Sequence, residues 1–257
     1  MYALVTGASS GIGQEMAVQF ARLGYNLIIV ARRKERLITL KEKLEKQYGI
    51  HVIVKSYDLS QISNCYRLYE ECKKYHISIL VNNAGFGKIG KFEEIPLEKE
   101  LSMIRTNIIA PHVVTKLFLK SMKKGRILNV ASIAGFQPDP MMATYGATKA
   151  YLINLSRALN YELKKQHRKI HISTLCPGPV DTEFDYVANS NFSLKYISAE
   201  QCVRIAIEGL FHNKELIIPN SRIKMLHLVS KLAPTRLVLP IGYLIQTSKL
   251  KISNKDK

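Results

Sequence analysis

YALVTGASSGIGQEMAVQFARLG, residues 2–24, joins a short apolar run to an amphipathic segment through a turn with three glycines. The run at residues 2–6 is typical of a buried strand, and residues 11–24 have the periodicity of a helix that ends at Gly24. The turn TGASSGIG, residues 6–13, allows a pyrophosphate to approach the backbone at the N-terminus of that helix. Its glycine spacing is GxxxGxG rather than the GxGxxG of many dinucleotide-binding folds. A glycine-rich turn without a ligand is the alternative interpretation.

Strand-like and helix-like segments continue to alternate after this unit. Further strands are expected at 26–31, 51–57, 77–85, 125–132, 169–178 and 214–219, and helices at 33–49, 60–76, 107–125, from 144 onward and at 199–211. We expect Ser60 to cap the helix after Asp58. This alternation predicts a doubly wound, Rossmann-like α/β fold: a parallel sheet with helices on both faces and a ligand crevice at the carboxyl ends of its strands. No repeat or linker divides the chain, so residues 1–257 are expected to form one domain.

Composition describes a globular protein, with 47% apolar and 23% charged residues. The four cysteines form no CxxC pair and no metal-ligand cluster, which favours free thiols in a reducing compartment and no metal site. Without a signal-peptide pattern or an apolar run of roughly 20 residues, a cytoplasmic protein is expected. The net charge of +18 is spread along the chain. A nucleic-acid binder would instead cluster its basic residues in a recognisable motif, so attraction for anionic small molecules is the better interpretation.

Two arginines follow the second expected strand, where a dinucleotide site meets the adenosine ribose. A carboxylate there accepts from the 2′-hydroxyl of NAD, whereas this chain has Arg32 and Arg33 and no carboxylate before Glu35. Guanidinium groups bind phosphate through paired, charge-assisted hydrogen bonds. The pattern therefore predicts NADP(H), which carries a 2′-phosphate. The alternative is a solvated start to a charged helix.

YGATKAYL, residues 145–152, places Tyr145 and Lys149 four residues apart on one expected helix. Positions i and i+4 share a helix face, so the phenol and the ammonium can converge on one point. A cation there would favour the phenolate and lower the pKa of the tyrosine from its usual value of about 10. A core tyrosine beside a solvated lysine would give the same pattern.

Further short motifs follow the glycine-rich turn in a fixed order along the chain. The set is TGASSGIG, Asp58-Leu59, Asn82-Asn83-Ala84-Gly85, Asn107, Ser132, Tyr145 with Lys149, and PGPVDT at 177–182. With these motifs, residues 2 to about 218 resemble the short-chain dehydrogenase/reductase family, in the NADP(H)-preferring carbonyl reductase branch of chains near 250 residues. The resemblance does not cover the tail, residues 221–257, which mixes basic and apolar residues and in which Pro234 and Pro240 are expected to interrupt any helix.

The resemblance implies roles for four catalytic residues. Tyr145 is expected to exchange a proton with the carbonyl or alcohol oxygen, helped by Lys149, which would also hold the nicotinamide ribose. Ser132 would hydrogen-bond the same oxygen, and Asn107 would hold a water in a proton relay. The small Gly146 and Ala147 would leave room for a cofactor. Capping roles are the alternatives: a strand end for Ser132, and helix N-termini for Asn107 and Asp58.

The same resemblance implies a complete cofactor site. Asp58 would contact adenine, Asn83 would lie near the adenosine ribose, and Val180 and Thr182 would bind the nicotinamide amide. The expected NADP(H)-binding residues are Gly7, Ser9, Ser10, Gly11, Ile12, Gly13, Arg32, Arg33, Asp58, Leu59, Asn83, Ala84, Gly85, Tyr145, Lys149, Val180 and Thr182.

The activity expected is interconversion of a ketone and a secondary alcohol. The candidate pocket residues are mostly apolar, which favours a 3-oxoacyl or steroid-like substrate. Residues 183–196 are expected to form a lid, and the chain to form a dimer or tetramer. The apolar side of the tail is expected to pack on the pocket or on a subunit, with peripheral membrane contact as the alternative. The rival function is a catalytically silent NADPH-binding regulator or redox sensor. The pocket candidates are Phe86, Ile133, Phe136, Met141, Met142 and residues 183–196.

Overall fold

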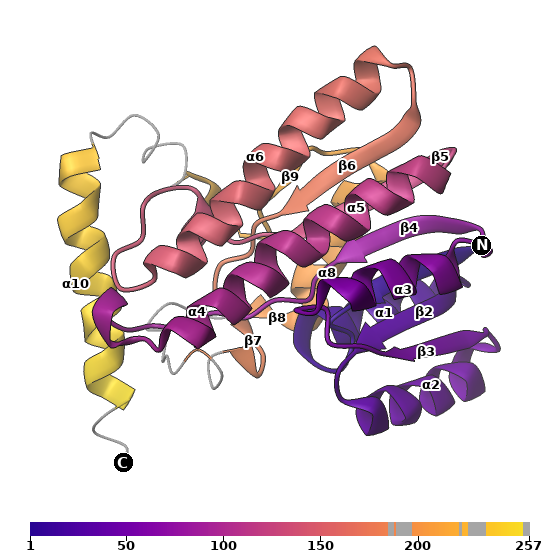
Figure 1. Cartoon of the computed structure of the whole chain (residues 1–257), viewed down its shortest axis with the longest axis horizontal. Helices are drawn as coiled ribbons and strands as arrows, with labels where there is room; N and C mark the ends of the chain where they lie inside the picture. Colours follow the sequence, from indigo (N-terminus) through magenta and orange to yellow (C-terminus); the bar gives the residue numbers. More distant parts are fainter. Residues whose placement is uncertain (185–187, 189–196, 221–222, 226–234, 254–257) are drawn as a thin grey trace.

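The computed structural model of the chain describes residues 1–184, 188, 197–220, 223–225 and 235–253. A seven-stranded sheet of order β3-β2-β1-β4-β5-β6-β9, parallel at every pairing, forms its centre (Figure 1). This confirms the predicted Rossmann-like α/β fold. The strands are β1 (Tyr2–Thr6), β2 (Asn26–Ala31), β3 (Val52–Ser56), β4 (Ile77–Asn82), β5 (Lys124–Val130), β6 (Lys169–Leu175) and β9 (Leu216–Ile217).

Helices cover both faces of this sheet because each carries an apolar stripe that must be buried. The helices that pack on one face are α1 (Gly11–Arg22), α2 (Lys34–Tyr48) and α8 (Ala199–Phe211). Those that pack on the other face are α3 (Ile62–Cys72), α5 (Ala110–Ser121) and α6 (Ala143–Lys165). Two short 3₁₀ turns, η1 (Phe92–Glu94) and η3 (Ile133–Gly135), precede α4 (Leu97–Ile104) and α6.

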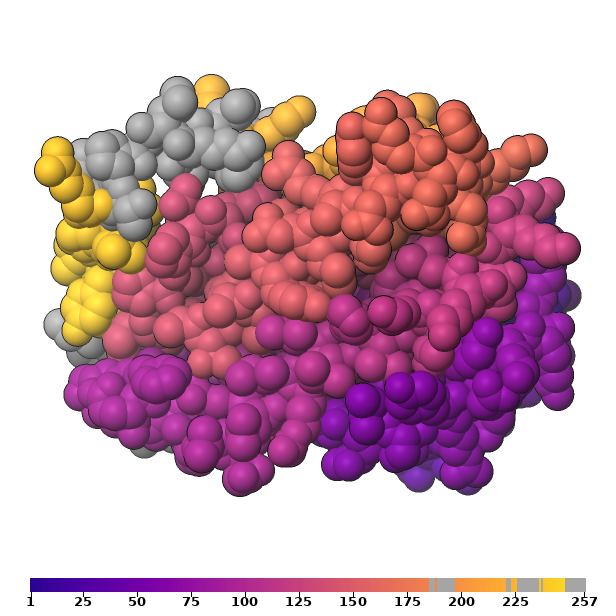
Figure 2. Space-filling view, turned by 45° about the horizontal axis from the view of Figure 1, so that its top comes forward, coloured from indigo at the N-terminus to yellow at the C-terminus, as the bar shows by residue number. Residues whose placement is uncertain are grey.

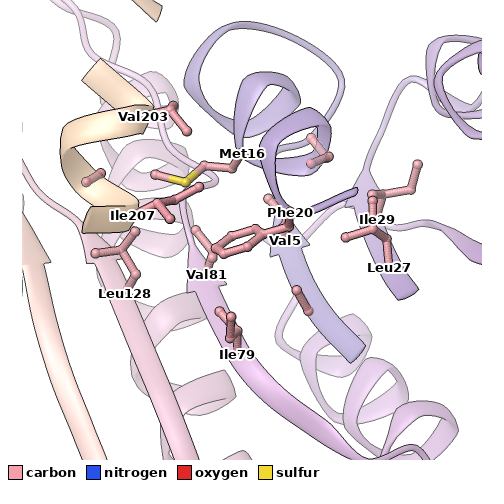
Figure 3. Close-up of a cluster of buried hydrophobic side chains, with 14 of the residues drawn as sticks. Val5, Met16, Phe20, Leu27, Ile29, Ile79, Val81, Leu128, Val203 and Ile207 are labelled. Carbon is pink, nitrogen blue, oxygen red and sulfur yellow. The ribbon is translucent and has the colours of Figure 1, made fainter. Parts of the chain in front are cut away.

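Fully buried apolar side chains fill the space between α1 and the sheet. Figure 3 shows Phe20 of α1 beside Val5 of β1 and Val81 of β4, and all three side chains are fully buried. Burying one such side chain contributes roughly 1.5–3 kcal/mol. The first helix is therefore held rigidly over the central strands, which fixes the glycine-rich turn that joins it to β1.

The order of the strands places a crevice beside that turn. From β1 the chain runs outward to β2 and β3, then crosses back to β4 on the other side of β1 and continues to β5 and β6. Loops after β1 and β4 therefore diverge, and ligands of doubly wound sheets bind at this point. A second, small parallel pair, β7 (Val180–Asp181) with β8 (Ile197–Ser198), was not predicted.

Two expected helix boundaries were wrong. The helix after Asp58 starts at Ile62 with Gln61 at its N-cap, because Asp58 Oδ1 accepts a hydrogen bond from Ser60 N at 2.9 Å in a local turn. The long helix expected at 107–125 begins instead at Leu97. It runs through α4, a π-helical segment (Arg105–Ile109) and α5, so Asn107 lies inside a helix and the N-cap alternative for it is excluded.

The tail also departs from expectation, because α10 (Thr235–Ser253) continues through Pro240. Proline removes one hydrogen bond from the helix ladder, but tertiary contacts outside the sequence pattern hold this helix in place. Gln246 Nε2 donates to Asp139 Oδ1 at 2.8 Å, and Gln246 is buried. Figures 1 and 2 show α10 at one end of the molecule, and Figure 1 shows the N-terminus at the other. Among the described residues, no helix is long and apolar enough to cross a membrane.

Candidate active site

A cavity of about 580 Å³ opens at the carboxyl ends of the strands. Its wall combines the turn after β1, the ends of β2 and β4, the loop after β5, the start of α6 and one side of α10. The sequence-predicted residues on this wall are Gly7, Ser9, Ser10, Gly11, Ile12, Arg32, Arg33, Asp58, Leu59, Asn83, Ala84, Gly85, Ser132, Tyr145, Lys149, Val180 and Thr182. Gly13 and Asn107 lie behind the wall and support it.

The glycine-rich turn requires glycine at two positions for different reasons. Gly7 has φ +69°, a left-handed conformation that a side chain disfavours. At Gly13 a Cβ would lie 2.3 Å from the carbonyl oxygen of Gly7, so only glycine lets α1 pack this closely on the turn. Ser10, the N-cap of α1, makes no side-chain capping bond. The first amides of α1 therefore remain available to an anion such as a pyrophosphate.

A hydrogen-bond hub under the turn joins β1 to β4. Thr6 Oγ1 accepts from the amides of Asn83 at 2.9 Å and Ala84 at 3.1 Å, and donates to Val81 O at 3.1 Å. Asn83 Nδ2 donates to Thr6 O at 2.9 Å and to Gly7 O at 3.3 Å. Asn83 thus positions the turn that it was predicted to flank. Thr6 lies within the glycine-rich motif, but its own sequence neighbours predict no role for it, because its partners come from a distant strand.

The arginine cluster at the end of β2 contains a carboxylate that the sequence did not reveal. Arg33 donates to Ser9 Oγ at 3.0 and 3.1 Å, to Ser10 Oγ at 2.7 Å and to Glu183 Oε2 at 2.8 Å. Arg36 donates to the other oxygen of Glu183 at 2.5 Å. The expectation that no carboxylate lies in reach before Glu35 was therefore wrong, since Glu183 arrives from the far end of the sheet. Hydrogen bonds from Arg33 and then Arg36 lower the pKa of Glu183 to about 2.

The catalytic candidates meet at the first turns of α6. Tyr145 and Lys149 are both buried, and Lys149 Nζ lies 5.6 Å from the centre of the tyrosine ring. Burial raises the pKa of the Tyr145 phenol, and a hydrogen bond with Ser132 partly lowers it. We expected Lys149 to lower this pKa, but burial has the larger effect in this arrangement. Ser132 Oγ also accepts from Ala134 N at 3.2 Å, so the capping alternative for Ser132 coexists with its contact to the phenol.

Lys149 has unused hydrogen-bonding capacity. Burial lowers the pKa of its ammonium to about 8. Its Nζ donates to Val130 O at 2.9 Å, which is the one acceptor for it among the described residues. An ammonium carries three donors, so Lys149 can hold hydroxyl groups of a ligand in the cavity.

The side chain of Asn107 is hydrogen-bonded to Phe86, in the loop after β4. Its Oδ1 accepts from Phe86 N at 3.1 Å, and its Nδ2 donates to Phe86 O at 2.9 Å and Thr148 Oγ1 at 3.1 Å. A Cβ at Gly85 would come within 2.9 Å of Asn107 Oδ1 and 3.4 Å of Lys149 Nζ. The side chain of Asn107 therefore positions residues 85–86, and its part in a proton relay stays a prediction.

The expected role of the two small residues between Tyr145 and Lys149 was wrong. A Cβ at Gly146 would lie 3.0 Å from the carbonyl oxygen of Ala134, and Ala147 is exposed to solvent. Neither residue is part of the cavity wall. The glycine lets α6 approach the loop that carries Ser132, which brings the serine to the tyrosine.

The part of the cavity beside Tyr145 is mainly apolar. Phe86, Ile133 and Met142 line it, and the Phe184 ring lies 5.5 Å from that of Tyr145. Two expected pocket residues lie elsewhere: Phe136 packs in a separate apolar cluster, and Met141 lines a smaller neighbouring cavity. Val238, Gly242, Ile245 and Gln246 of α10 belong to the wall, which agrees with the expectation that one side of the tail packs on the pocket, although the sequence singled out none of these four residues. Of the predicted lid, residues 185–187 and 189–196 lie outside the described residues, as do 221–222, 226–234 and 254–257 of the tail.

Comparison with known proteins gives one consistent result. The family model of the short chain dehydrogenases matches residues 1–192. A similar curated protein is the 11-beta-hydroxysteroid dehydrogenase-like protein 4A of Arabidopsis thaliana, 31% identical over 91% of this chain and 81% of that protein. A very-long-chain 3-oxoacyl-CoA reductase of Laccaria bicolor is 35% identical over 67% of this chain, which spans only 54% of the relative. Among solved structures, a short-chain dehydrogenase from Sphingobium yanoikuyae in complex with NADPH has TM-score 0.80 and 32% identity, covering 90% of this chain and 93% of that one.

Proposed function

This chain belongs to the short-chain dehydrogenase/reductase family, an oxidoreductase family acting on CH–OH groups, and we propose that it interconverts a hydrophobic ketone and a secondary alcohol with NADP(H). The observation that carries the proposal is the meeting of Ser132, Tyr145 and Lys149 at one wall of the cavity. The rest of that wall offers a glycine-rich anion site and an arginine cluster. These features supply separate places for the two halves of a dinucleotide and for a carbonyl compound.

The protein side of the reaction follows from the chemistry of three residues. Bound NADP(H) supplies or accepts the hydride. Ser132 donates a hydrogen bond to the substrate oxygen and orients it toward the phenol of Tyr145. Because burial raises the pKa of Tyr145, the phenol is protonated at neutral pH and can give its proton to the developing alkoxide. Lys149 holds ribose hydroxyls through its unused N–H groups and, while charged, stabilises the tyrosinate that is left.

The described residues suit a dinucleotide along the whole cavity. The amides at the start of α1 would donate hydrogen bonds to the pyrophosphate, and Asp58 and Leu59, which line the cavity, would contact adenine. Arg32 and Arg33 support the choice of NADP(H) over NAD(H), because they provide guanidinium donors for a 2′-phosphate. The NADPH complex of the Sphingobium protein adds support from a relative.

The substrate class is proposed from the wall around Tyr145. Phe86, Met142 and Phe184 offer flat or adaptable apolar surfaces, and α10 extends the same side of the cavity. A steroid-like ring system or a 3-oxoacyl chain suits such a surface better than a sugar does. The names of the Arabidopsis and Laccaria relatives point to the same two classes.

The deciding experiment follows NADPH oxidation by the purified full chain with a panel of ketones: 3-oxoacyl thioesters, steroid ketones and small hydrophilic ketones. We expect turnover with hydrophobic members, and loss of turnover in Tyr145→Phe with NADPH binding retained. Turnover restricted to small hydrophilic ketones would refute the substrate class. NADPH binding without turnover on any ketone would favour the rival function, a regulator or redox sensor.

The proposal also includes a cytoplasmic location and a contact surface on α10. The four cysteines are buried free thiols, which supports a reducing, cytoplasmic compartment. Ile241 and Leu244 of α10 do not line the cavity and are 59% and 68% exposed, which supports contact with a second subunit or a membrane surface. Light scattering of the wild type and of Leu244→Asp, together with sedimentation on anionic vesicles, separates homo-oligomer formation from peripheral membrane binding.

A further inference from the structure

We propose that Glu183 sets the cofactor selectivity of this site by holding, as a carboxylate, the place that Arg33 and Arg36 offer to a phosphate. This rests on the proposed function, since it concerns how the same site chooses between NADP(H) and NAD(H). In this role Glu183 is a built-in competitor: it weakens the binding of a cofactor with a 2′-phosphate and leaves binding of one without it largely unchanged.

In this cluster each of the three guanidinium nitrogens of Arg33 donates at least one hydrogen bond. Its Nε and one terminal nitrogen donate to Ser9 and Ser10, and its other terminal nitrogen donates to Glu183 at 2.8 Å. The serines fix the plane of the guanidinium, so the edge that faces Glu183 is the one left for an anion. Carboxylate and phosphate oxygens recognise that edge with the same geometry.

Arg36 makes the carboxylate a bridge rather than a single contact. Its terminal nitrogen donates to Glu183 Oε1 at 2.5 Å, so the two oxygens of Glu183 are divided between two guanidiniums. The single negative charge of Glu183 is thus paired with the positive charges of both Arg33 and Arg36. A phosphate dianion entering the cluster must displace this bridge or accept the repulsion of a neighbouring carboxylate.

Glu183 is far from Arg33 in sequence, and the fold brings the two residues together. Thr182, the preceding residue, packs against Gly11, where a Cβ would meet its side chain at 3.1 Å. Glu183 and Arg33 line the same cavity although 150 positions separate them. The carboxylate therefore stands where residues of the cofactor site converge, and it is part of that site.

Exposure sets the size of the expected effect. The side chains of Arg33, Arg36 and Glu183 are 42%, 50% and 46% exposed, so each ion pair is partly screened by solvent. Two such pairs lost on phosphate entry correspond to an affinity change of about five- to tenfold. The pKa of Glu183 lies near 2, so the competition persists across the pH range of ordinary assays.

The test uses two fragments of the cofactor that lack nicotinamide, which separates this site from catalysis. Dissociation constants of 2′,5′-ADP and 5′-AMP are measured by calorimetry at low salt for the full-length wild type, Glu183→Gln and Glu183→Ala. The matched control is Glu35→Gln, which removes one charge at the start of α2 from a residue that has no ion pair among those described. Thermal unfolding confirms that each variant is folded.

We expect both Glu183 variants to bind 2′,5′-ADP about five- to tenfold more tightly, with 5′-AMP unchanged within twofold and the control near wild type. Unchanged or weaker binding of 2′,5′-ADP in both variants overturns the inference, while its binding by the wild type leaves the NADP(H) proposal intact. If neither wild type nor variants bind 2′,5′-ADP, the inference and the NADP(H) assignment both fail. Ketone reduction with NADH would then still support the oxidoreductase function.

Discussion

Replacing Lys149 by methionine is expected to abolish activity and yet stabilise the protein at neutral pH. Burial lowers the pKa of this ammonium from 10.5 to about 8, so the folded state holds the charge against a penalty. The difference between these two pKa values corresponds to about 3 kcal/mol at pH 7. Methionine has a similar length and no charge, so the variant avoids this penalty.

The sign of the pH dependence follows from proton linkage. Below pH 8 both folded and unfolded states carry the charge, and the full penalty is present. Between pH 8 and 10.5 the unfolded chain binds more protons, so the wild type gains stability as pH rises. The advantage of Lys149→Met should therefore fall from about 3 kcal/mol at pH 7 to about 1 kcal/mol at pH 10. The lost hydrogen bond to Val130 O acts at both pH values and cancels from this difference.

The assay is urea unfolding of the protein without cofactor at pH 7 and pH 10, for wild type, Lys149→Met and Lys164→Met. Lys164 lies on the same helix and is exposed, so its substitution controls for a general loss of positive charge. The control should match the wild type within about 0.5 kcal/mol at both pH values. A stability difference for Lys149→Met that stays the same from pH 7 to pH 10 would refute the depressed pKa on which the reasoning depends.

Three further predictions test the same site. Tyr145→Phe should lower kcat for ketone reduction by about 10²- to 10⁴-fold with NADPH affinity kept, whereas a small effect on kcat would exclude the tyrosine as proton donor. Because burial raises the pKa of Tyr145, alcohol oxidation should rise about tenfold per pH unit from pH 6 to pH 7.5, below the pKa of Lys149 near 8, while reduction stays flat; equal profiles in both directions would contradict this. Gly13→Ala places a methyl group 2.3 Å from the carbonyl oxygen of Gly7, a backbone atom that cannot move aside, and should cost about 3 kcal/mol or more in urea unfolding. Gly24→Ala is the control, because a Cβ at Gly24 would have no atom within 4 Å and only the positive φ would be unfavourable, which should cost about 1–2 kcal/mol. An equal loss of stability in both variants would refute the steric explanation for Gly13.

The fold could be predicted from sequence because its information is local. Apolar runs alternate with amphipathic helices, and parallel strands require that order. The ends of helices were harder to predict from sequence where contacts with distant residues determine them. Proline alone predicts a break at Pro240, but the helix continues, and Gln246 in the same helix is hydrogen-bonded to Asp139, more than a hundred residues away. The π-helical segment around Asn107 likewise gives no periodic pattern of its own.

Some features of the candidate site could be predicted from sequence and others could not. The residues on the cavity wall were accessible because they end strands or begin helices, where a doubly wound sheet gathers its ligands. Glu183 was not accessible, since nothing near it in the chain marks it as a partner of Arg33. The direction of the Tyr145 pKa was also mispredicted. Sequence spacing places a cation beside the phenol, but it says nothing of how completely the surrounding loops exclude water from both groups.

Arg33 and Lys149, at the two ends of the cavity, are held by different interactions. We therefore expect substitutions around them to be tolerated to different degrees. Arg33 is neutralised by an exposed carboxylate, which a single surface substitution can remove at small cost in stability. Lys149 is held by a backbone carbonyl inside the protein, and the π-helical segment, Gly85 and α6 enclose it. Cofactor selectivity should therefore be easy to change by mutation. The proposed proton-transfer centre is harder to change, because moving Lys149 would require rebuilding the elements around it.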